Sequence, residues 1–137
     1  MTLTLHYVEY KGVFNLKIAK ISDAEYEIMK IIWNEEGEVT TADIVEKLGE
    51  DNSWKLTTIL TLANRLVDKN VLSLRKEGRI NYYSPNISKE EYKSYQANDF
   101  IEDMYDGSVK SLIASLYNTK KIKKEDIDEL KDWIRRI

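Results

Sequence analysis

The chain has 137 residues, of which 42% are hydrophobic, so it can form one domain of ordinary size or a small domain with an extension. Charged residues make up 33% and the mean hydropathy is -0.51, and no apolar run approaches the roughly 20 residues that a membrane-spanning helix needs. Cysteine is absent, which excludes disulfides, thiolate metal sites and cysteine nucleophiles.

The net charge of -3 is distributed unevenly along the chain. Residues 53–86 carry six Lys or Arg and two acids, whereas residues 21–52 carry two Lys and ten acids. Polyanion binding depends on the local field at the docking face, so an acidic total does not exclude nucleic acid as a partner. It does predict an affinity that is weak and strongly dependent on salt.

Residues 1–20 form an N-terminal extension of unknown role. Thr2–Tyr10 alternate polar and apolar residues, as a strand does, but no partner strand is evident nearby. We interpret the segment as a loosely ordered extension or an upstream translation start, with an added strand or arm as the alternative. It lacks the apolar core and the cleavage site of a signal peptide, so we expect a cytoplasmic location.

Two short helices are predicted between residues 21 and 52. Ser22 and Glu25 have the spacing of a capping box, so the first helix should begin there. Its buried stripe consists of Ile28, Met29, Ile32 and Trp33. Thr40 or Thr41 should cap the second helix, which ends before Gly49. The inward residues of the second helix are Ala42, Ile44, Val45 and Leu48.

The stretch Ser53–Pro85 is predicted to form a third helix and a β-hairpin. Ser53 is the expected cap of this helix, whose buried residues recur at three- and four-residue spacing: Leu56, Ile59, Leu62, Ala63, Leu66 and Val67. The β-rich runs Val71–Leu74 and Ile80–Tyr83 flank a basic loop, Arg75–Arg79, whose glycine can adopt the positive φ of a tight turn. A helix with a polar outer face followed by a basic two-stranded wing is typical of a winged helix-turn-helix DNA-binding protein.

Beyond Pro85 the pattern is helical to the end of the chain. Ser88 and Glu91 form a capping box that opens a fourth helix, Gly107 should separate it from a fifth, and the last helix covers Lys124–Ile137. The tail has too few apolar residues for a core of its own, so we interpret its stripe as a dimer interface. The predicted dimerisation residues are Phe100, Ile101, Met104, Tyr105, Val109, Leu112, Ile113, Leu116 and Tyr117.

These elements predict a mainly α protein with a small β-hairpin wing. The expected domains are the N-terminal extension at residues 1–20, a winged helix-turn-helix domain at residues 21–86 and a helical dimerisation region at residues 87–137. The alternative to a dimer is a tail that folds back on the first domain as ordinary core. The dimer is favoured because the first three helices and the hairpin are expected to form a complete core without the tail.

The outer face of the third helix is the candidate DNA-reading surface. Thr is a poor helix former, so helix propensity alone does not favour three of them here. In a major groove their hydroxyl and methyl groups suit base edges, phosphates and thymine methyls, Asn64 can pair with adenine, and Arg65 with guanine or phosphate. The alternative is a merely solvated polar face. With the phosphate-contacting cations, the predicted DNA-binding residues are Lys55, Thr57, Thr58, Thr61, Asn64, Arg65, Lys69, Arg75, Lys76 and Arg79.

Two residues beside this helix have competing interpretations. Lys69 follows the last turn, where a cation is favourable to the helix dipole whether or not DNA is bound. Trp54 precedes the first turn and either fills the core or lies against the sugar-phosphate backbone.

Signatures of an enzyme are missing from the sequence. The single histidine, His6, lies in the N-terminal extension, and the five glycines occur singly, without a phosphate-binding loop. Two runs of carboxylates stand out, at residues 35–38 and 125–129, and both have the pattern of solvated helix ends. We therefore expect no catalytic residue, no metal site and no cofactor.

Several segments together resemble the penicillinase-repressor family (BlaI/MecI type), which are winged-helix transcriptional repressors of bacteria. Ile21–Trp33 (ISDAEYEIMKIIW) is similar to the family's I-S-x-A-E-W-x-V-M-x-I-I-W, with Tyr26 in place of a Trp. Trp54–Asn70 is similar to the recognition-helix pattern T-I-x-T-L-x-x-R-L-x-x-K. The resemblance covers roughly residues 21–137, with further matches at Tyr82-Tyr83-Ser84, Phe100, Tyr105, Gly107, Ser111-Leu112 and Glu129-Leu130.

The resemblance implies a homodimer that binds an inverted-repeat operator in double-stranded DNA and blocks transcription. In the antibiotic-responsive members of the family, a membrane metalloprotease sensor relieves repression by triggering a cut within the fourth helix. The corresponding place here is near Asn98, Asp99 and Phe100. A cut there would separate the DNA-binding domain from the dimerisation stripe.

Two departures from the family matter. The family commonly has Lys and Arg where this chain has Thr57 and Leu60, so the helix is less basic and its operator is expected to differ. The copper-responsive branch uses a cysteine-rich metal site, which a chain without cysteine cannot form. Two other functions stay open at this point: a winged-helix module that binds protein, and a repressor gated by a small molecule.

Overall fold

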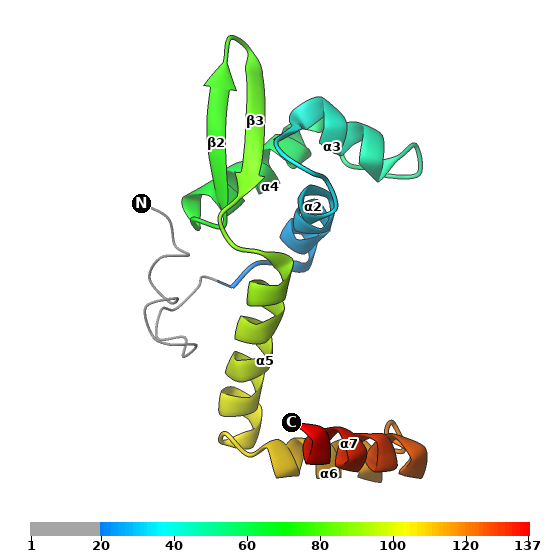
Figure 1. Ribbon diagram of the computed structural model, residues 1–137. Coiled ribbons are helices and arrows are strands. Elements are labelled where there is room, and N and C mark those ends of the chain that lie inside the picture. The colour runs from blue at the N-terminus through cyan, green and yellow to red at the C-terminus, as the bar shows by residue number, and fades with distance from the viewer. Residues whose placement is uncertain (1–19) are drawn as a thin grey trace. The chain divides into compact units, whose positions relative to one another are not determined.

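The computed structural model describes residues 20–137, which divide into two compact units, one ending at Tyr92 and one comprising Lys93–Ile137 (Figure 1). The predicted strand or arm at Thr2–Tyr10 therefore lies outside the described residues. The helices are α2 (Asp23–Trp33), α3 (Thr41–Leu48), α4 (Leu56–Asp68), α5 (Lys89–Tyr105), α6 (Val109–Asn118) and α7 (Lys124–Arg136). The strands are β1 (Val39–Thr40), β2 (Leu72–Glu77) and β3 (Ile80–Pro85).

A capping box begins α2, as predicted, and α3, for which only a threonine cap was predicted, also begins with a capping box. The hydroxyl oxygen of Ser22 accepts from the backbone N–H of Glu25 at 3.1 Å, and the Glu25 carboxylate accepts from the N–H of Ser22 at 2.8 Å. Thr40, the first of the two candidate caps, exchanges the same pair of hydrogen bonds with Asp43 at 3.1 and 2.9 Å. Each helix therefore begins where its side chains satisfy the free amides of its first turn.

The prediction that Ser53 caps α4 is wrong, because the N-cap is Lys55. The side chain of Asn52 accepts from the backbone N–H of Trp54 at 2.7 Å, which holds residues 52–54 in a turn. The first amides to bond within the helix are those of Thr58 and Ile59, which donate to the carbonyl of Lys55 at 3.0 and 3.1 Å. The helix thus starts two residues later than expected, without a side-chain cap.

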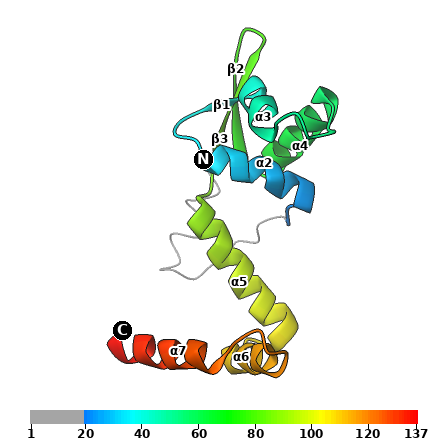
Figure 2. The same ribbon diagram turned by 90° about the vertical axis from the view of Figure 1, so that its right-hand side faces the viewer.

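The wing is longer and better supported than a basic loop between two short strands. β2 and β3 continue to Glu77 and Ile80, so only Gly78 and Arg79 form the turn, with φ of 61° at the glycine. A strand that the sequence pattern did not indicate, β1, pairs with β3, and the antiparallel sheet has the order β1-β3-β2. Figures 1 and 2 show the β2–β3 hairpin extending beyond α2, α3 and α4.

The core of the N-terminal unit lies between the three helices and one face of the sheet. Val39, Leu74 and Tyr83 share one row across the sheet, and Val39 and Tyr83 are completely buried. The helices contribute most of the predicted apolar stripes: Ile28, Met29, Ile32, Ile44, Ile59, Leu62, Ala63 and Leu66. The prediction is wrong for Ala42, Val45 and Leu56, which are exposed. Burial of the side chains that do lie in the core fixes which face of α4 remains outside.

The first turn of α5 belongs to the N-terminal unit. The capping box of Ser88 and Glu91 is present, and the indole N–H of Trp33 donates to the carbonyl of Ile87 at 2.9 Å. Tyr92 packs with its ring centroid 5.6 Å from that of Trp33 and 6.2 Å from that of Tyr26. These aromatic contacts hold the beginning of α5 against α2.

The C-terminal unit consists of the rest of α5 with α6 and α7. Gly107, with φ of 79°, separates α5 from α6 as predicted. No residue of α6 or α7 is buried. Mainly helical content with a small antiparallel sheet, arranged as a winged helix-turn-helix, confirms the predicted fold class. Among the described residues, no helix combines the length and apolarity needed to cross a membrane.

Candidate nucleic-acid interface

The polar face of α4 lies opposite its buried face and is open to solvent. Thr57, Thr61, Asn64, Arg65 and Asp68 are all exposed, whereas Ile59, Leu62, Ala63 and Leu66 on the other side are buried. Residues at these positions project from successive turns of one helix, about 100° apart per residue. The face predicted from periodicity is therefore continuous over the length of α4.

Within this face one threonine is held by its own helix. The hydroxyl of Thr61 donates to the carbonyl of Thr57 at 2.9 Å. With its proton engaged, the hydroxyl of Thr61 can still accept a hydrogen bond, and its methyl group remains available for an apolar contact. Such a side chain suits a base-edge donor or a thymine methyl group.

The N-terminal end of α4 carries no acidic residue in its first turn and no side-chain cap. Its free amides and the positive end of the helix dipole are therefore not compensated by an acid of that turn. Lys55 at the N-cap and Thr58 in the first turn are both exposed beside this end. Amides, dipole and ammonium together favour an anion such as a phosphate.

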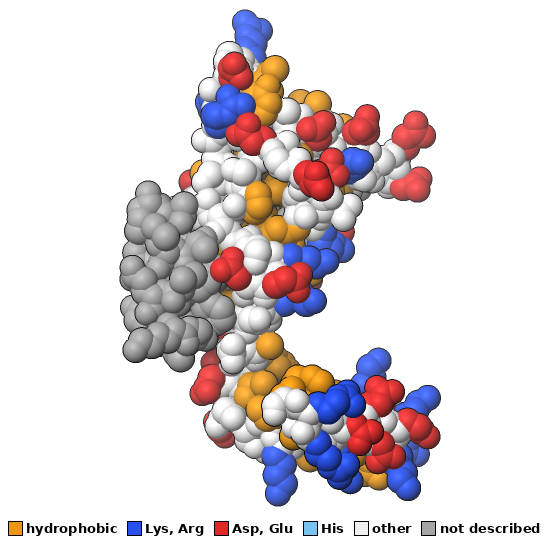
Figure 3. All heavy atoms as spheres, viewed as in Figure 1, with side chains coloured by type: hydrophobic (Ala, Val, Ile, Leu, Met, Phe, Trp, Pro, Cys, Tyr) orange, Lys and Arg blue, Asp and Glu red, His pale blue; other side chains and the backbone are white. Residues whose placement is uncertain are grey.

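The six cations predicted to face DNA fall into two groups. Among residues 20–137, no ion pair or side-chain hydrogen bond engages the exposed side chains of Lys55, Arg65, Lys76 and Arg79. Lys69 and Arg75, in contrast, are bound by carboxylates of the same unit. In the space-filling view, Lys and Arg side chains occupy the far end of the hairpin, with acidic side chains nearby (Figure 3).

Lys69 has an internal role that the sequence pattern did not indicate. Its ammonium donates to the carboxylate of Glu25 at 2.6 Å and to the carbonyl of Lys20 at 2.8 Å. The Glu25 side chain is 2% exposed and that of Lys69 27% exposed. Burial alone would raise the pKa of Glu25, but the hydrogen bonds from Lys69 and from the N–H of Ser22 outweigh it and lower that pKa.

Arg75 is bound by two acids of the sheet region. Its guanidinium donates to both oxygens of Glu38, at 2.9 Å from Nε and 2.8 Å from a terminal nitrogen, and to Glu77 at 3.1 Å. The hydrogen bonds from Arg75 lower the pKa of Glu38. The structure thus brings the predicted reading face and four free cations together in one unit and gives two further cations intramolecular partners.

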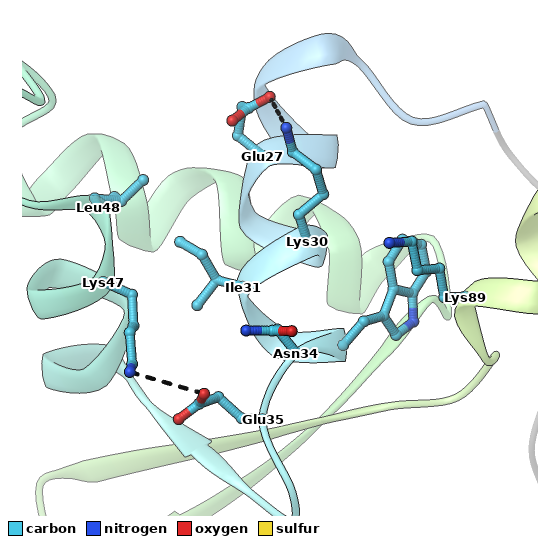
Figure 4. A pocket seen from close by; sticks show the side chains of 9 residues that line it. Glu27, Lys30, Ile31, Asn34, Glu35, Lys47, Leu48 and Lys89 are labelled. Carbon is cyan, nitrogen blue, oxygen red and sulfur yellow. Dashed lines mark ion pairs between the residues drawn. The ribbon is translucent and has the colours of Figure 1, made fainter.

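A hollow of about 510 Å³ lies elsewhere on the N-terminal unit, between α2 and α3 (Figure 4). Two of its lysines are engaged with acids of its own wall, Lys30 with Glu27 at 2.8 Å and Lys47 with Glu35 at 3.9 Å. None of the predicted DNA-binding residues lines it. This hollow is therefore separate from the candidate interface.

The predicted dimerisation stripe of the C-terminal unit is open to solvent. Phe100, Met104, Val109 and Tyr117 are between 49% and 66% exposed. The other five predicted residues, Ile101, Tyr105, Leu112, Ile113 and Leu116, are partly exposed. Near the end of the chain, Trp133, Ile134 and Ile137 are more than half exposed as well. The same unit has a hollow of about 450 Å³, whose lining is mainly apolar: Leu116, Ile122, Leu130 and Trp133, together with Lys121, Asp126 and Glu129.

Residues 21–136 match the sequence model of the family described as penicillinase repressor. The penicillinase repressor of Bacillus licheniformis is 34% identical over 114 residues, which is 83% of this chain and 88% of the relative. The penicillinase repressor of Staphylococcus aureus is 31% identical over 121 residues, 88% of this chain and 95% of the relative. A solution structure of monomeric Bacillus licheniformis BlaI with the blaP half-operator is 41% identical, covers 56% of this chain and 92% of that chain, and has a TM-score of 0.47.

Proposed function

This chain belongs to the penicillinase repressor family, and from this premise we propose that it represses transcription as a homodimer bound to an inverted-repeat operator. The family consists of transcriptional repressors and not of enzymes. The observation that carries the proposal is that the polar face of α4 and four exposed cations of α4 and the hairpin are not occupied by ion pairs within the part of the chain that the structure describes. An uninterrupted polar face is accompanied by four exposed cations without carboxylate partners among the described residues.

In the proposed complex α4 lies in the major groove. Thr57, Thr61 and Asn64 face the base edges, and Arg65, on the flank of the same face, bonds a guanine or a phosphate. Leu60, which is partly exposed beside them, adds no charge to the interface. Sequence readout in this complex therefore depends on uncharged groups more than on arginine.

Phosphate contacts position the reader without reading sequence. Lys55 and Thr58 at the start of α4 bind one phosphate group, aided by the helix dipole. Lys76 and Arg79 at the end of the hairpin bind the backbone beyond the groove. Lys69 acts indirectly, because its ammonium is engaged with Glu25.

The C-terminal unit forms the dimer. Its apolar side chains are exposed in one chain, and a second copy offers the same surface to cover them. The hollow lined by Leu116 and Trp133 gives an apolar side chain of the partner a place to insert. Two copies of α4 then enter successive major grooves of a palindromic site, and the two half-sites bind cooperatively.

Release from DNA occurs by a cut in α5, near Asn98, Asp99 and Phe100, made by a protease linked to a membrane sensor. Asn98 and Phe100 are exposed, so their side chains are accessible, although the backbone there is helical and must open locally before it is cut. In cells exposed to a β-lactam we expect a fragment that ends near Asp99. If the uncut, full-length chain dissociates from the operator under these conditions, this part of the proposal is contradicted.

Binding is tested by electrophoretic mobility shift with the DNA upstream of the protein's own gene. Arg65→Ala and Asn64→Ala should each lower the affinity for this DNA, measured from the shift, about tenfold or more. Lys47→Ala is the matched control, because it removes a cation from the hollow between α2 and α3, which none of the predicted DNA-binding residues lines. A shift that Arg65→Ala and Arg79→Ala leave unchanged counts against DNA binding through this face.

A further inference from the structure

Arg75 and Lys76 are neighbours in β2 but project from opposite faces of the sheet. Leu74, Tyr83 and Val39 form one row, and the burial of Tyr83 and Val39 shows that this row faces the helices. The next row is Arg75, Tyr82 and Thr40, whose side chains project from the other face because side chains alternate along a strand. Lys76 returns to the face that α4 packs against.

The guanidinium of Arg75 is held across its own row. It lies over the ring of Tyr82, 4.2 Å from the ring centroid, and reaches Glu38 just before β1. The fork of Nε and one terminal nitrogen meets the two oxygens of Glu38, and the other terminal nitrogen meets Glu77. One side chain of β2 thereby ties all three strands of the sheet together.

This geometry leaves little for a phosphate to bind. The fork that suits a phosphate is already filled by a carboxylate of the same shape. Two acids surround one base, so the cluster repels a polyanion unless one carboxylate is removed. A phosphate that displaced Glu38 would also lie close to the carboxylate that it displaced.

We infer that Arg75 is a positioning residue which braces the wing through Glu38 and Tyr82 and does not contact DNA phosphate. The inference rests on the proposed DNA-binding function and assigns backbone contact in the wing to Lys76 and Arg79 alone. With the brace closed, the hairpin keeps one angle to the helices, so these two cations reach the backbone together with α4.

The first experiment exchanges the charges of the brace. Binding of the full chain to a duplex from the region upstream of its own gene is measured by fluorescence anisotropy over a series of salt concentrations. Arg75→Gln should weaken binding about fivefold through the displaced wing. The doubly substituted Glu38→Arg, Arg75→Glu variant restores an ion pair between the two positions at unchanged net charge, but without the contacts to Glu77 and Tyr82. It should bind more tightly than Arg75→Gln and with the salt dependence of the wild type.

The matched control is Lys76→Glu in the adjacent position of β2. This variant should lower the slope of log affinity against log salt by about 0.9 for the phosphate contact that it loses, and Glu38→Arg should not restore that slope. Loss of slope in the exchanged Glu38→Arg, Arg75→Glu protein, similar to that of Lys76→Glu, would overturn the inference. Thermal unfolding of each variant, followed by circular dichroism, shows whether a loss of binding reflects a loss of fold.

The second experiment observes the guanidinium itself by nuclear magnetic resonance. In the free protein the Nε–H of Arg75 should give a signal protected from exchange, because it donates to Glu38, and Glu38→Ala, which removes the acceptor, should abolish that protection. Addition of the duplex should leave this signal in place while the signal of Arg79 shifts. A shift of the Arg75 signal on DNA addition overturns the inference.

The two proposals fail in different ways. A wild-type protein that binds no duplex at low salt refutes the proposed function, and the signal of Arg75 in the free protein still reports whether the brace exists. A wild-type protein that binds DNA, with an Arg75 signal that is already unprotected, refutes the brace alone.

Discussion

The ammonium of Lys69, one residue beyond α4, lies 2.6 Å from the carboxylate of Glu25 in the first turn of α2. The same carboxylate accepts the backbone N–H of Ser22, so one buried acid caps α2 and also fixes the end of α4. The lysine is a residue of the recognition-helix pattern, yet its position serves the alignment of that helix.

Lys69→Met should destabilise the protein by about 2 kcal/mol, because it leaves a buried carboxylate without its charged partner and the lysine was only partly exposed. Urea unfolding measures the change. Lys55→Met removes an exposed cation at the other end of α4 that has no ion-pair partner among residues 20–137, and should change stability by no more than about 0.5 kcal/mol. Adding Glu25→Gln to Lys69→Met should recover part of the loss, and a further loss would contradict the pairing.

Stability should fall as the pH drops below the ordinary pKa of a glutamate. The folded-state pKa of Glu25 is lowered from 4.5, so in the acid range the unfolded chain binds more protons than the native one. The stabilisation from this carboxylate is therefore complete above about pH 4.5 and is lost as the pH falls through the folded pKa.

The measurement compares urea unfolding of the wild type and of Glu25→Gln between about pH 7 and pH 3. The stability difference between them should stay constant at neutral pH and shrink in acid. Glu38 and Asp43, whose pKa values are also lowered, titrate in both proteins, so their contributions cancel in the difference. A difference that does not vary with pH would show that the charge of Glu25 contributes nothing.

Much of the fold could be predicted from the sequence, because the signals are local. The capping boxes at Ser22 and Ser88 and the period of Ile59, Leu62 and Leu66 each operate within a few residues. The start of α4 was misplaced because an Asn52 turn competes with Ser53 as a cap. The sequence does not predict β1, because a strand of two residues is too short to show an alternating pattern of polar and apolar residues. Only the pairing of Val39 with Tyr83 defines it as a strand.

The candidate site could be predicted as a surface but not as a set of available charges. The exposed face of α4 follows from periodicity, whereas the engagement of Lys69 and Arg75 depends on partners far away in the chain. Glu25 precedes Lys69 by 44 residues and Glu38 precedes Arg75 by 37, and neither spacing has a local signature. Only the packing of α2 and β1 against the rest of the unit brings those acids to the cations.

Asn64 and Lys55 should affect DNA binding in different ways. Asn64→Ala should cost about 1–3 kcal/mol on the preferred duplex and reduce discrimination against a duplex altered at the base pair it reads. Lys55→Ala should weaken all duplexes alike and lower the salt slope by about 0.9. Anisotropy titrations with duplexes that differ at single base pairs test both, and equal effects of Asn64→Ala on every duplex would place it outside direct readout.

Val109 and Lys110 begin α6 side by side, and they allow the proposed dimer to be tested with a matched pair of charge substitutions. Val109 is 56% exposed, so Val109→Glu should leave the single chain folded, and an acid in a first helical turn is favourable to the dipole. In a dimer the same glutamate would be buried in an apolar interface. We therefore expect Val109→Glu to sediment as a monomer and Lys110→Glu to remain a dimer.

The effect of Val109→Glu on DNA binding distinguishes a dimer interface from a surface that merely affects folding. A monomer keeps its α4, so affinity for a duplex with one half-site should be unchanged, whereas affinity for the palindrome should fall to the value for one half-site. Lys110→Glu should retain cooperative binding to the palindrome. A wild-type protein that sediments as a monomer at working concentrations, or equal losses on both duplexes in Val109→Glu, would contradict assembly through the C-terminal unit.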